Sequence, residues 1–510
     1  MRKRAYRSVL AAVTAASAMA LPLVSAAPAS ADPDPAAFSR SLTAPTVKRH
    51  LEKLQEIANA NGGTRASGTP GFDRSVDYVA GKLRKAGYRV TLQEFEFPFF
   101  RELEKPALAR TAPSPKTYVP DTDFATMTYS GSGDVSGTVQ GVDLVLPPTP
   151  APSSTSGCEA SDFAGFTAGN IALLQRGTCT FQIKVENALA AGASAVIIFN
   201  EGQPGRDGLL NGTLGVPFTI PVVGTTFAAG NELASAGTAV QLKTRTESDL
   251  HRKTRNIIAD HRSGNPDKVV ALGAHLDSVV AGPGINDNGS GSAAILETAL
   301  RLAPLPTKNK LRFYFWGAEE LGLLGSEHHV ANLSAEERAK IKLYLNFDMI
   351  ASPNYTFGIY DGDDSDGVGA PAGPPGSDKI EKLFEKYYTT IGKPFVGTDF
   401  TGRSDYGPFI EVGIPAGGLF TGAEGIKTED EAAKFGGQAG VAYDKCYHQE
   451  CDNLANINDE ALAINSGAVA TAALVYAYSK ELPGSGTPGS TTPGTGGGGD
   501  DHDHGHTVSE

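Results

Sequence analysis

The residue types that could do chemistry in this chain are imidazoles and carboxylates scattered over its second half. The candidate metal ligands are His275, Asp287, Glu320, Asp348 and His448. Zinc in hydrolases binds such side chains and keeps an open position for water. Two zinc ions ~3.5–4 Å apart can share a carboxylate and a water. Glu319 has no place among these ligands and is the candidate general base. A hydrolytic two-metal centre is therefore the leading hypothesis.

Three apolar runs must position these side chains: 268–274, 311–316 and 342–347. Continuous apolar runs are typical of strands buried on both faces of a sheet. His275 follows the first run directly and Asp348 follows the third, while Glu319 comes shortly after the second. Ligands of open α/β sheets gather outside the carboxyl ends of the strands, so these residues are expected to meet there.

The remaining candidates are placed by loops. Asp287 lies in a glycine-rich loop before a predicted helix, where a short carboxylate could bridge two ions. Asp277 could accept the imidazole N–H of His275 and fix its ring. Each of these residue patterns, taken alone, has an ordinary structural explanation that needs no metal. His275 and Asp277 could be a hydrogen-bonded polar pair, Asp348 a helix cap, and Glu319 with Glu320 a solvated helix start. The hypothesis depends on all of them occurring together.

Strands and helices alternate around these sites. Amphipathic or apolar patterns predict helices over 46–60, 73–86, 290–303, 320–331 and 459–478, and an alternating strand over 88–95. This order predicts an α/β fold, with a mixed, mostly parallel central sheet flanked by helices.

The length of 510 residues is too great for one ordinary core. From about residue 113 the composition turns rich in proline, glycine, serine and threonine, and no acid–base cluster occurs there. We therefore expect a β-rich insert in the catalytic domain. The expected divisions are a signal peptide (1–31), catalytic parts (32–119 and 248–482), the insert (120–247) and a disordered, His-rich tail (483–510).

The first 31 residues have the pattern of a secretory signal: four basic residues, an apolar stretch and a small-residue cleavage site. A membrane anchor is the alternative, but the stretch is short and rich in alanine. The protein is thus expected to be secreted. An even number of cysteines favours disulfides in such a protein, with zinc ligation as the competing interpretation. Sequence neighbours suggest the pairs Cys158–Cys179 and Cys446–Cys451, and the second pair would brace the loop of His448.

The formal charge of −13 comes without a basic stripe. We therefore expect no nucleic-acid partner. No run outside the signal has ~18 uninterrupted apolar residues, so no membrane partner is expected.

With these residues assembled, the chain resembles secreted dizinc aminopeptidases of the leucine-aminopeptidase type. The matching strings are Gly273-Ala-His-Leu-Asp-Ser, Gly284-Ile-Asn-Asp-Asn-Gly-Ser-Gly, Trp316-Gly-Ala-Glu-Glu-Leu-Gly, Asn346-Phe-Asp-Met and Cys446-Tyr-His. The segments Leu174-Gln-Arg-Gly-Thr-Cys-Thr-Phe and Ala190-Ala-Gly-Ala resemble a protease-associated domain, which is common as an insert in this family and elsewhere.

The resemblance implies a role for each site residue. His275 and Asp348 would bind one zinc, Glu320 and His448 the other, and Asp287 would bridge them. Glu319 would be the general base and acid, and Tyr447 would stabilise the oxyanion. The implied substrate-pocket residues are Met349, Gly402, Arg403 and Phe420. The Asp287–Asn288 peptide is expected to be cis. Some relatives also bind calcium, for which the sequence suggests no residues.

The predicted function is hydrolysis of the first peptide bond of peptides and proteins with free N-termini, with a preference for large apolar first residues. Two alternatives stay open. A dizinc carboxypeptidase on the same fold would need basic residues to hold a C-terminal carboxylate, and only Arg403 is a candidate. A non-catalytic binding ectodomain would be expected to have lost metal ligands. A single-zinc cyclase is disfavoured because ligands for two ions are present.

Overall fold

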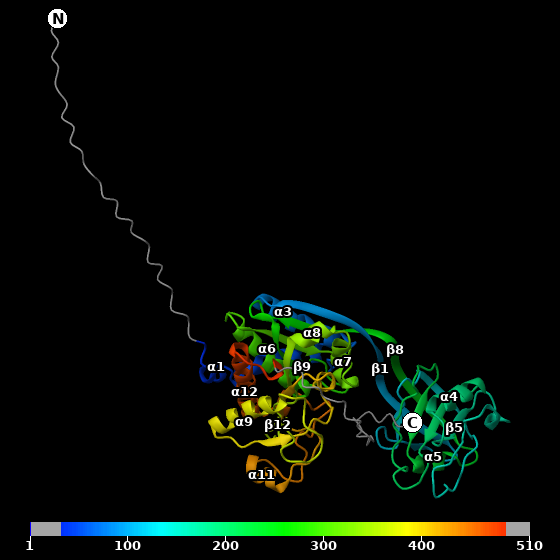
Figure 1. Ribbon diagram of the computed structural model, residues 1–510. Coiled ribbons are helices and arrows are strands. Elements are labelled where there is room, and N and C mark those ends of the chain that lie inside the picture. The colour runs from blue at the N-terminus through cyan, green and yellow to red at the C-terminus, as the bar shows by residue number, and fades with distance from the viewer. Residues whose placement is uncertain (2–31, 486–510) are drawn as a thin grey trace.

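A mixed, mostly parallel β-sheet forms the centre of the catalytic half, as predicted (Figure 1). The computed structural model describes Met1 and residues 32–485, so the expected signal peptide and nearly all of the expected tail lie outside the described residues. From one edge the strand order is β13-β12-β14-β11-β9-β10-β8, with β1 paired to β8. The strands are β1 (Arg89–Ala112), β8 (Ala239–Asp260), β9 (Asn265–His275), β10 (Asn309–Trp316), β11 (Ile341–Phe347), β12 (Gly358–Tyr360), β13 (Val396–Thr398) and β14 (Ala416–Phe420).

The strands of the candidate site are parallel neighbours. β9 pairs with β10 on one side, with His275 opposite Trp316, and with β11 on the other, with Gly273 opposite Asn346. The carboxyl ends of β9, β10 and β11 therefore meet at one edge of the sheet, as the apolar runs predicted.

Helices cover both faces of this sheet. One face packs against a large core that includes Leu51, Phe72 and Val469, and the other buries the aromatic side chains of Trp316 and Tyr344. The helices are α1 (Pro35–Ser41), α2 (Ala44–Ala60), α3 (Pro70–Ala86), α6 (Gly291–Leu302), α7 (Leu324–Ala331), α8 (Ala335–Lys340), α9 (Ser377–Ile391), α10 (Gly407–Glu411), α11 (Glu429–Phe435) and α12 (Asp459–Tyr478).

The helix expected over 320–331 is interrupted. A short 3-10 turn, η3 (Glu319–Leu321), is followed by Gly322 (φ 96°) and Leu323 (φ 61°), and α7 starts only at Leu324. Left-handed backbone cannot continue an α-helix, so the chain is redirected between the two elements. The break holds the two adjacent glutamates in the turn at the end of β10 instead of in a regular helix.

Two long strands connect the catalytic half to an inserted module. β1 has 24 residues and β8 has 22, and they pair antiparallel from Arg89 opposite Asp260 to Ala112 opposite Ala239. The strand predicted over 88–95 was therefore too short. The residues between these strands, 113–238, are called the insert below.

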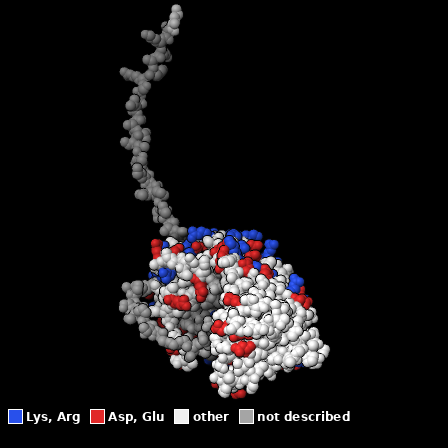
Figure 2. All heavy atoms as spheres, turned by 90° about the vertical axis from the view of Figure 1, so that its right-hand side faces the viewer, with Lys and Arg blue, Asp and Glu red and all other residues white. Residues whose placement is uncertain are grey.

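The insert is a small sheet with an apolar layer on each face. β5, β6 and β7 are parallel and fully buried, and one layer includes Phe181 and Val185 while the other includes Phe199 and Leu233. Its elements are β2 (Lys116–Thr117), β3 (Phe124–Thr126), β4 (Gly133–Gly141), η1 (Ala160–Phe163), β5 (Ile171–Gln175), α4 (Phe181–Ala190), β6 (Ala195–Phe199), β7 (Val222–Thr225) and α5 (Phe227–Leu233). The side of the molecule on which the insert lies shows broad uncharged areas with scattered acidic groups (Figure 2).

Both expected disulfides are present. Cys158 is bonded to Cys179, and Cys446 is bonded to Cys451. Among the residues that the structure describes, α12 alone is long and apolar enough to cross a membrane, and 72% of its apolar window is buried inside the protein. Its side chains belong to the large core of the catalytic half.

Candidate metal centre and active site

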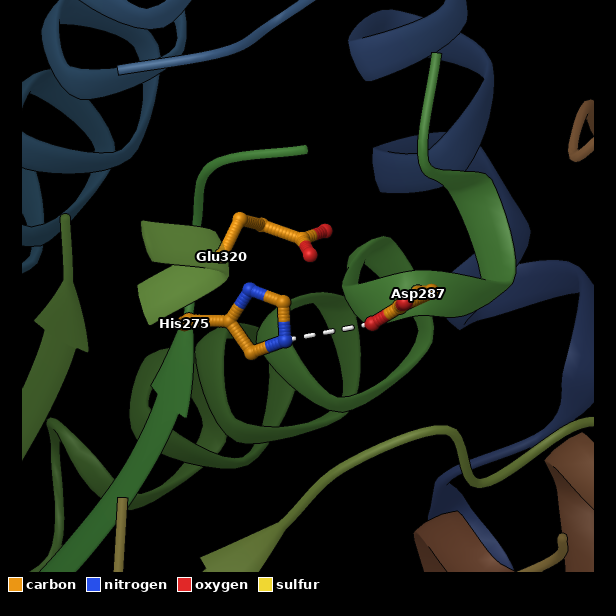
Figure 3. Close-up of side chains that lie close together, drawn as sticks. All are labelled: His275, Asp287 and Glu320. Atoms are coloured by element: carbon orange, nitrogen blue, oxygen red, sulfur yellow. Dashed lines mark ion pairs between the residues drawn. The ribbon is translucent and has the colours of Figure 1, made fainter. Parts of the chain in front are cut away.

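The predicted ligands converge from separate elements. His275 is the last residue of β9, Asp348 follows β11, and Glu320 lies in η3 after β10. Asp287 lies in the short helical turn η2 (Ile285–Ser290) that precedes α6, and His448 comes from a loop between α11 and α12. Figure 3 shows the side chains of His275, Asp287 and Glu320 directed toward one another.

One group of side chains surrounds the imidazole of His275. Its Nε2 lies 3.2 Å from Asp287 Oδ1, 3.3 Å from Asp348 Oδ1 and 3.7 Å from Glu319 Oε2. The ligand atoms of His275, Glu319 and Asp348 all lie within 4.8 Å of one another. This spacing is close enough for one metal ion to contact a nitrogen and several oxygens at once.

The second group surrounds the imidazole of His448. Its Nε2 lies 2.9 Å from Glu320 Oε2 and 3.3 Å from Asp287 Oδ2. The two oxygens of Asp287 thus face different imidazoles, Oδ1 toward His275 and Oδ2 toward His448. A carboxylate in this position is arranged to bridge two ions.

Backbone contacts fix the tautomer of His275. Its Nδ1 lies 3.2 Å from the carbonyl oxygen of Asp277 and 3.7 Å from that residue's Oδ1. The backbone oxygen, rather than the carboxylate that the sequence suggested, is thus the nearer acceptor for the ring N–H. Since Nδ1 donates, Nε2 is the nitrogen that faces the carboxylates.

A chain of hydrogen bonds orients Asp348. The indole of Trp316 donates to the hydroxyl of Tyr344 (2.8 Å), which donates to Asn346 (3.1 Å). The amide of Asn346 donates to the hydroxyl of Ser404 (2.8 Å), which donates to Asp348 Oδ2 (2.6 Å). One oxygen of Asp348 is therefore held by the protein, and the other, Oδ1, has no hydrogen-bond partner.

The loop that carries Asp287 is anchored from its backbone. The carboxylate of Asp452 accepts hydrogen bonds from the N–H groups of Asn286 (2.9 Å) and Asp287 (3.0 Å). The buried guanidinium of Arg65 donates to the carbonyl oxygens of Pro283 (2.8 Å) and Gly284 (2.5 Å). The peptide bond between Asp287 and Asn288 is cis, as the resemblance implied.

Sequence reasoning missed Arg65, Ser404 and Asp452. Their roles are visible only from contacts across more than 50 positions of the chain. The one local signal is that Asp452 adjoins Cys451, whose loop the sequence had already connected to the site.

The centre holds more buried negative charge than its imidazoles can balance. Burial, followed by the nearby Asp287 carboxylate, raises the pKa of Glu320 to about 7. Burial alone would lower the pKa of His448, but the carboxylates of Glu320 and Asp287 outweigh it and raise that pKa to about 11. Burial also raises the pKa of Glu319 well above its ordinary value. Carboxylates this close together are normally balanced by cations.

The residues present fit bound divalent metal ions. Glu320 Oε1 and Asp348 Oδ1 are buried acceptors without a hydrogen-bond partner. Buried carboxylate oxygens are rarely left unsatisfied, and a metal ion is one of the partners that explain such an exception. Imidazole nitrogen and carboxylate oxygen are also the donor types that zinc accepts.

His448 is held in an unusual conformation beside Tyr447. Its φ is 58°, and the rings of Tyr447 and His448 are stacked with centroids 3.8 Å apart. The disulfide between Cys446 and Cys451 closes the loop around both residues. Arg403 donates from Nη2 to the hydroxyl of Tyr447 (3.2 Å) and pairs through Nη1 with Glu424 (2.6 Å). The tyrosine hydroxyl is therefore oriented at the edge of the centre.

A pocket of about 480 Å³ opens onto these side chains. Three of the four expected pocket residues line it: Met349, Arg403 and Phe420. The fourth, Gly402, is not among the lining residues, and its N–H donates to the hydroxyl of Tyr406, which does line the pocket. The sequence did not predict that the insert would contribute, yet residues such as Tyr129 line the same pocket.

Another acidic group lies apart from this pocket. Ligand atoms of Asp361, Asp363 and Glu381 lie within 4.8 Å of one another. The carboxylate of Asp361 accepts hydrogen bonds from the backbone N–H groups of Asp363 (3.2 Å) and Ser365 (3.1 Å), and Glu381 accepts one from Gly362 (2.9 Å). These bonds account for the cluster as a loop anchor, and we assign no calcium site to it.

Comparisons with known proteins agree with this geometry. The model of peptidase family M28 matches residues 256–473, and that of the PA domain matches residues 140–233. An aminopeptidase of Pseudomonas aeruginosa is 52% identical over 443 residues, which cover 86% of this chain and 81% of the relative. A probable leucine aminopeptidase 2 of Aspergillus fumigatus is 45% identical over 419 residues, which cover 81% of this chain and 79% of the relative.

Among solved structures, a zinc aminopeptidase from Bacillus subtilis has a TM-score of 0.57 at 26% identity, covering 86% of this chain and 96% of its own. The fold, the converging ligand set and the close relatives lead to one conclusion. The chain belongs to peptidase family M28 and is a metallo-aminopeptidase with an inserted PA domain.

Proposed function

We propose that this protein is a secreted aminopeptidase with two zinc ions, which removes large apolar residues from the N-termini of peptides. The observation that carries the proposal is the position of Asp287, whose two carboxylate oxygens face the imidazoles of His275 and His448. Asp348 completes the first set and Glu320 the second, and each has one oxygen without a hydrogen bond. The Bacillus subtilis relative, described as a zinc aminopeptidase, supports zinc as the metal.

Zinc ions held by these two sets would polarise the first peptide carbonyl and acidify a water molecule. Glu319 lies beside the first set, with its Oε2 3.7 Å from His275 Nε2, and takes the role of base instead of ligand. A carboxylate in this position can take a proton from the attacking water and then deliver it to the leaving amine.

Other side chains bind the substrate. The hydroxyl of Tyr447, held by Arg403, donates a hydrogen bond to the oxygen on which negative charge develops. Glu319 and Asp348 provide negative charge for the free amino group of the substrate. Met349 and Phe420 line the pocket and form an apolar surface for the first side chain, which favours Leu, Phe or Met.

Two further parts of the proposal concern the chain as a whole. The two disulfides support export, because disulfides persist in oxidising compartments. The two distinct apolar layers around β5, β6 and β7 support an inserted module at about 120–247 between the catalytic parts 32–119 and 248–482.

The function is tested with a panel of aminoacyl p-nitroanilides, assayed with and without a chelator. Leu, Phe and Met substrates should be cleaved faster than Gly or Asp substrates, and the chelator should abolish cleavage until zinc is restored. N-acetyl-leucine p-nitroanilide should not be cleaved, since it lacks the free amino group. Cleavage of acetylated peptides from their C-terminal end would instead identify a carboxypeptidase.

A further inference from the structure

The insert and the catalytic half both contribute residues to the lining of this pocket. Thr128, Tyr129 and Thr213 of the insert line it together with Phe100 of β1 and Leu321 of η3. None of these side chains is charged. The cavity is continuous with the catalytic centre, because Glu319 and His448 line the same pocket. We call these five residues the uncharged wall.

Tyr129 is held firmly in this wall. Its φ of 72° lies in the left-handed region, which a bulky side chain rarely adopts. Its carbonyl oxygen accepts a hydrogen bond from the N–H of Phe218 (2.9 Å), and Thr128 exchanges backbone hydrogen bonds with Gly212 and Leu214 (3.0 Å each). A strained conformation that its surroundings impose in this way is typical of ligand-binding positions.

The ring of Tyr129 is buried against Phe100, while the residue also lines the pocket. The two rings pack edge-on, with centroids 5.9 Å apart, and Tyr129 is only 9% exposed. Tyrosine combines an apolar ring with a polar hydroxyl, so a tyrosine packed in this way can offer its hydroxyl to a ligand in the pocket.

Different parts of the pocket would hold different parts of a peptide. The carboxylates draw the free amino group to the metal centre, so the later residues of the peptide would lie against the rest of the lining, which includes the uncharged wall. A charged side chain there would lose hydration without gaining an opposite charge. An uncharged side chain would lose little.

We propose that the uncharged wall binds the second and third residues of the peptide, selects against charge at the second, and uses the hydroxyl of Tyr129 to bind the peptide backbone. The proposal rests on the proposed aminopeptidase function and makes the insert part of the substrate site.

The first test introduces a charge. Thr213 is half-buried, and its hydroxyl accepts a hydrogen bond from the N–H of Gly215 (3.1 Å), which the carboxylate of Thr213→Asp can still accept. The substrates are Leu-Lys-Gly-amide and Leu-Glu-Gly-amide, and their cleavage is measured as the rate at which leucine is released. The ratio of their kcat/KM values should rise about fivefold in the variant. Thr167→Asp, on an exposed loop of the insert outside the pocket, is the matched control and should leave the ratio unchanged.

The second test removes the hydroxyl. Tyr129→Phe should lower kcat/KM for Leu-Phe-Gly-amide about fivefold more than for leucine p-nitroanilide, which has no second residue. Tyr118→Phe, in the other apolar layer of the insert, is its control. A constant lysine-to-glutamate ratio in Thr213→Asp, or an equal loss on both substrates in Tyr129→Phe, would overturn the inference. Absence of leucine p-nitroanilide cleavage by the unaltered protein would instead overturn the proposed function.

Discussion

Parallel strands end in polar residues in both halves of the molecule, but the two halves treat these residues differently. In the insert, Gln175 ends β5, and its side-chain oxygen accepts from the N–H of Val145 (2.9 Å). Its amide nitrogen donates to the carbonyl oxygens of Val145 and Glu201 (3.2 Å each). Two residues after β6, Glu201 accepts from the N–H groups of Ser153 (2.8 Å) and Ser154 (2.9 Å). The side chains at these strand ends are thus hydrogen-bonded to the backbone of the insert itself.

In the catalytic half, the corresponding positions gather carboxylates and leave Glu320 Oε1 and Asp348 Oδ1 without a hydrogen-bond partner. Both halves contain parallel strands, so topology alone does not distinguish a site from a scaffold. The difference at the strand ends described here is that Gln175 and Glu201 are hydrogen-bonded within the chain, whereas Glu320 and Asp348 each keep one oxygen without a hydrogen bond.

The largest expected effect comes from the catalytic side of this comparison. Glu319→Gln keeps the shape of the side chain but cannot accept a proton, so kcat for leucine p-nitroanilide should fall ~10²–10⁴-fold. Zinc content, measured by elemental analysis after dialysis, should stay at that of the unaltered protein. The matched control is Glu201→Gln at the strand end of the insert, for which activity at 25 °C should stay within about twofold, because Glu201 is outside the pocket. Loss of zinc from Glu319→Gln would contradict its role as the base.

On the insert side, the expected effect is on stability. Glu201 is 1% exposed, and Glu201→Ala leaves the N–H groups of Ser153 and Ser154 and the guanidinium of Arg206 without their acceptor. The free energy of unfolding of the insert should fall by about 3 kcal/mol. Hydrogen exchange of peptides from β5 and β6, compared between Glu201→Ala and the unaltered protein, measures this loss of stability.

The control for this stability prediction is Glu186→Ala, at an exposed position of α4, which should change the exchange by less than about 0.5 kcal/mol. If both variants exchanged alike, the strand end of the insert would not be a closed hydrogen-bonded group.

A smaller effect separates two buried histidines of the catalytic half. His329, unlike His275, has ordinary partners: its ring nitrogens lie 3.1 Å from Gln93 Oε1 and from the hydroxyl of Tyr314. Burial lowers the pKa of His329 to about 3. Below the ordinary histidine pKa of ~6.5 the unfolded chain binds a proton that the folded protein does not. The contribution of His329 to the free energy of unfolding is therefore fully present above pH ~6.5. It is lost as the pH falls, and at pH 5 it is smaller by about 2 kcal/mol.

Urea unfolding at pH 7.5 and pH 5 measures this loss. The free energy of unfolding should differ less between pH 7.5 and pH 5 in His329→Gln than in the unaltered protein, by about 2 kcal/mol. His328→Gln, at a less buried neighbour, is the control and should change the difference less. An unchanged pH dependence in His329→Gln would show that the proton is taken up elsewhere.

The sequence predicted much of the fold because its strongest patterns are local. The apolar runs at β9, β10 and β11 and the apolar helix α12 are long and regular, and the structure has them nearly where they were expected. The helix over 320–331 failed because left-handed residues such as Leu323 leave no clear pattern. The length of β1 was missed because its exposed half is stabilised by pairing with β8, which is more than 120 residues away.

For the site, the ligand types and strand ends could be read from the sequence, but their surroundings could not. The hydrogen-bond chain from Trp316 through Ser404 to Asp348 joins three separate segments, and no local spacing encodes it. The same holds for the contribution of Tyr129 to the pocket. Such contacts depend on how the insert and the catalytic half pack, which local patterns do not determine.

The paired strands β1 and β8 are the two connections between the catalytic half and the insert, and they lie side by side. The chain leaves the catalytic sheet on β1 and returns beside the same strand on β8, so Ala112 and Ala239 are direct neighbours. A module attached at this point adds its residues without changing the order of the strands that carry the metal ligands. The catalytic half therefore needs no rearrangement of its own sheet to accommodate the insert.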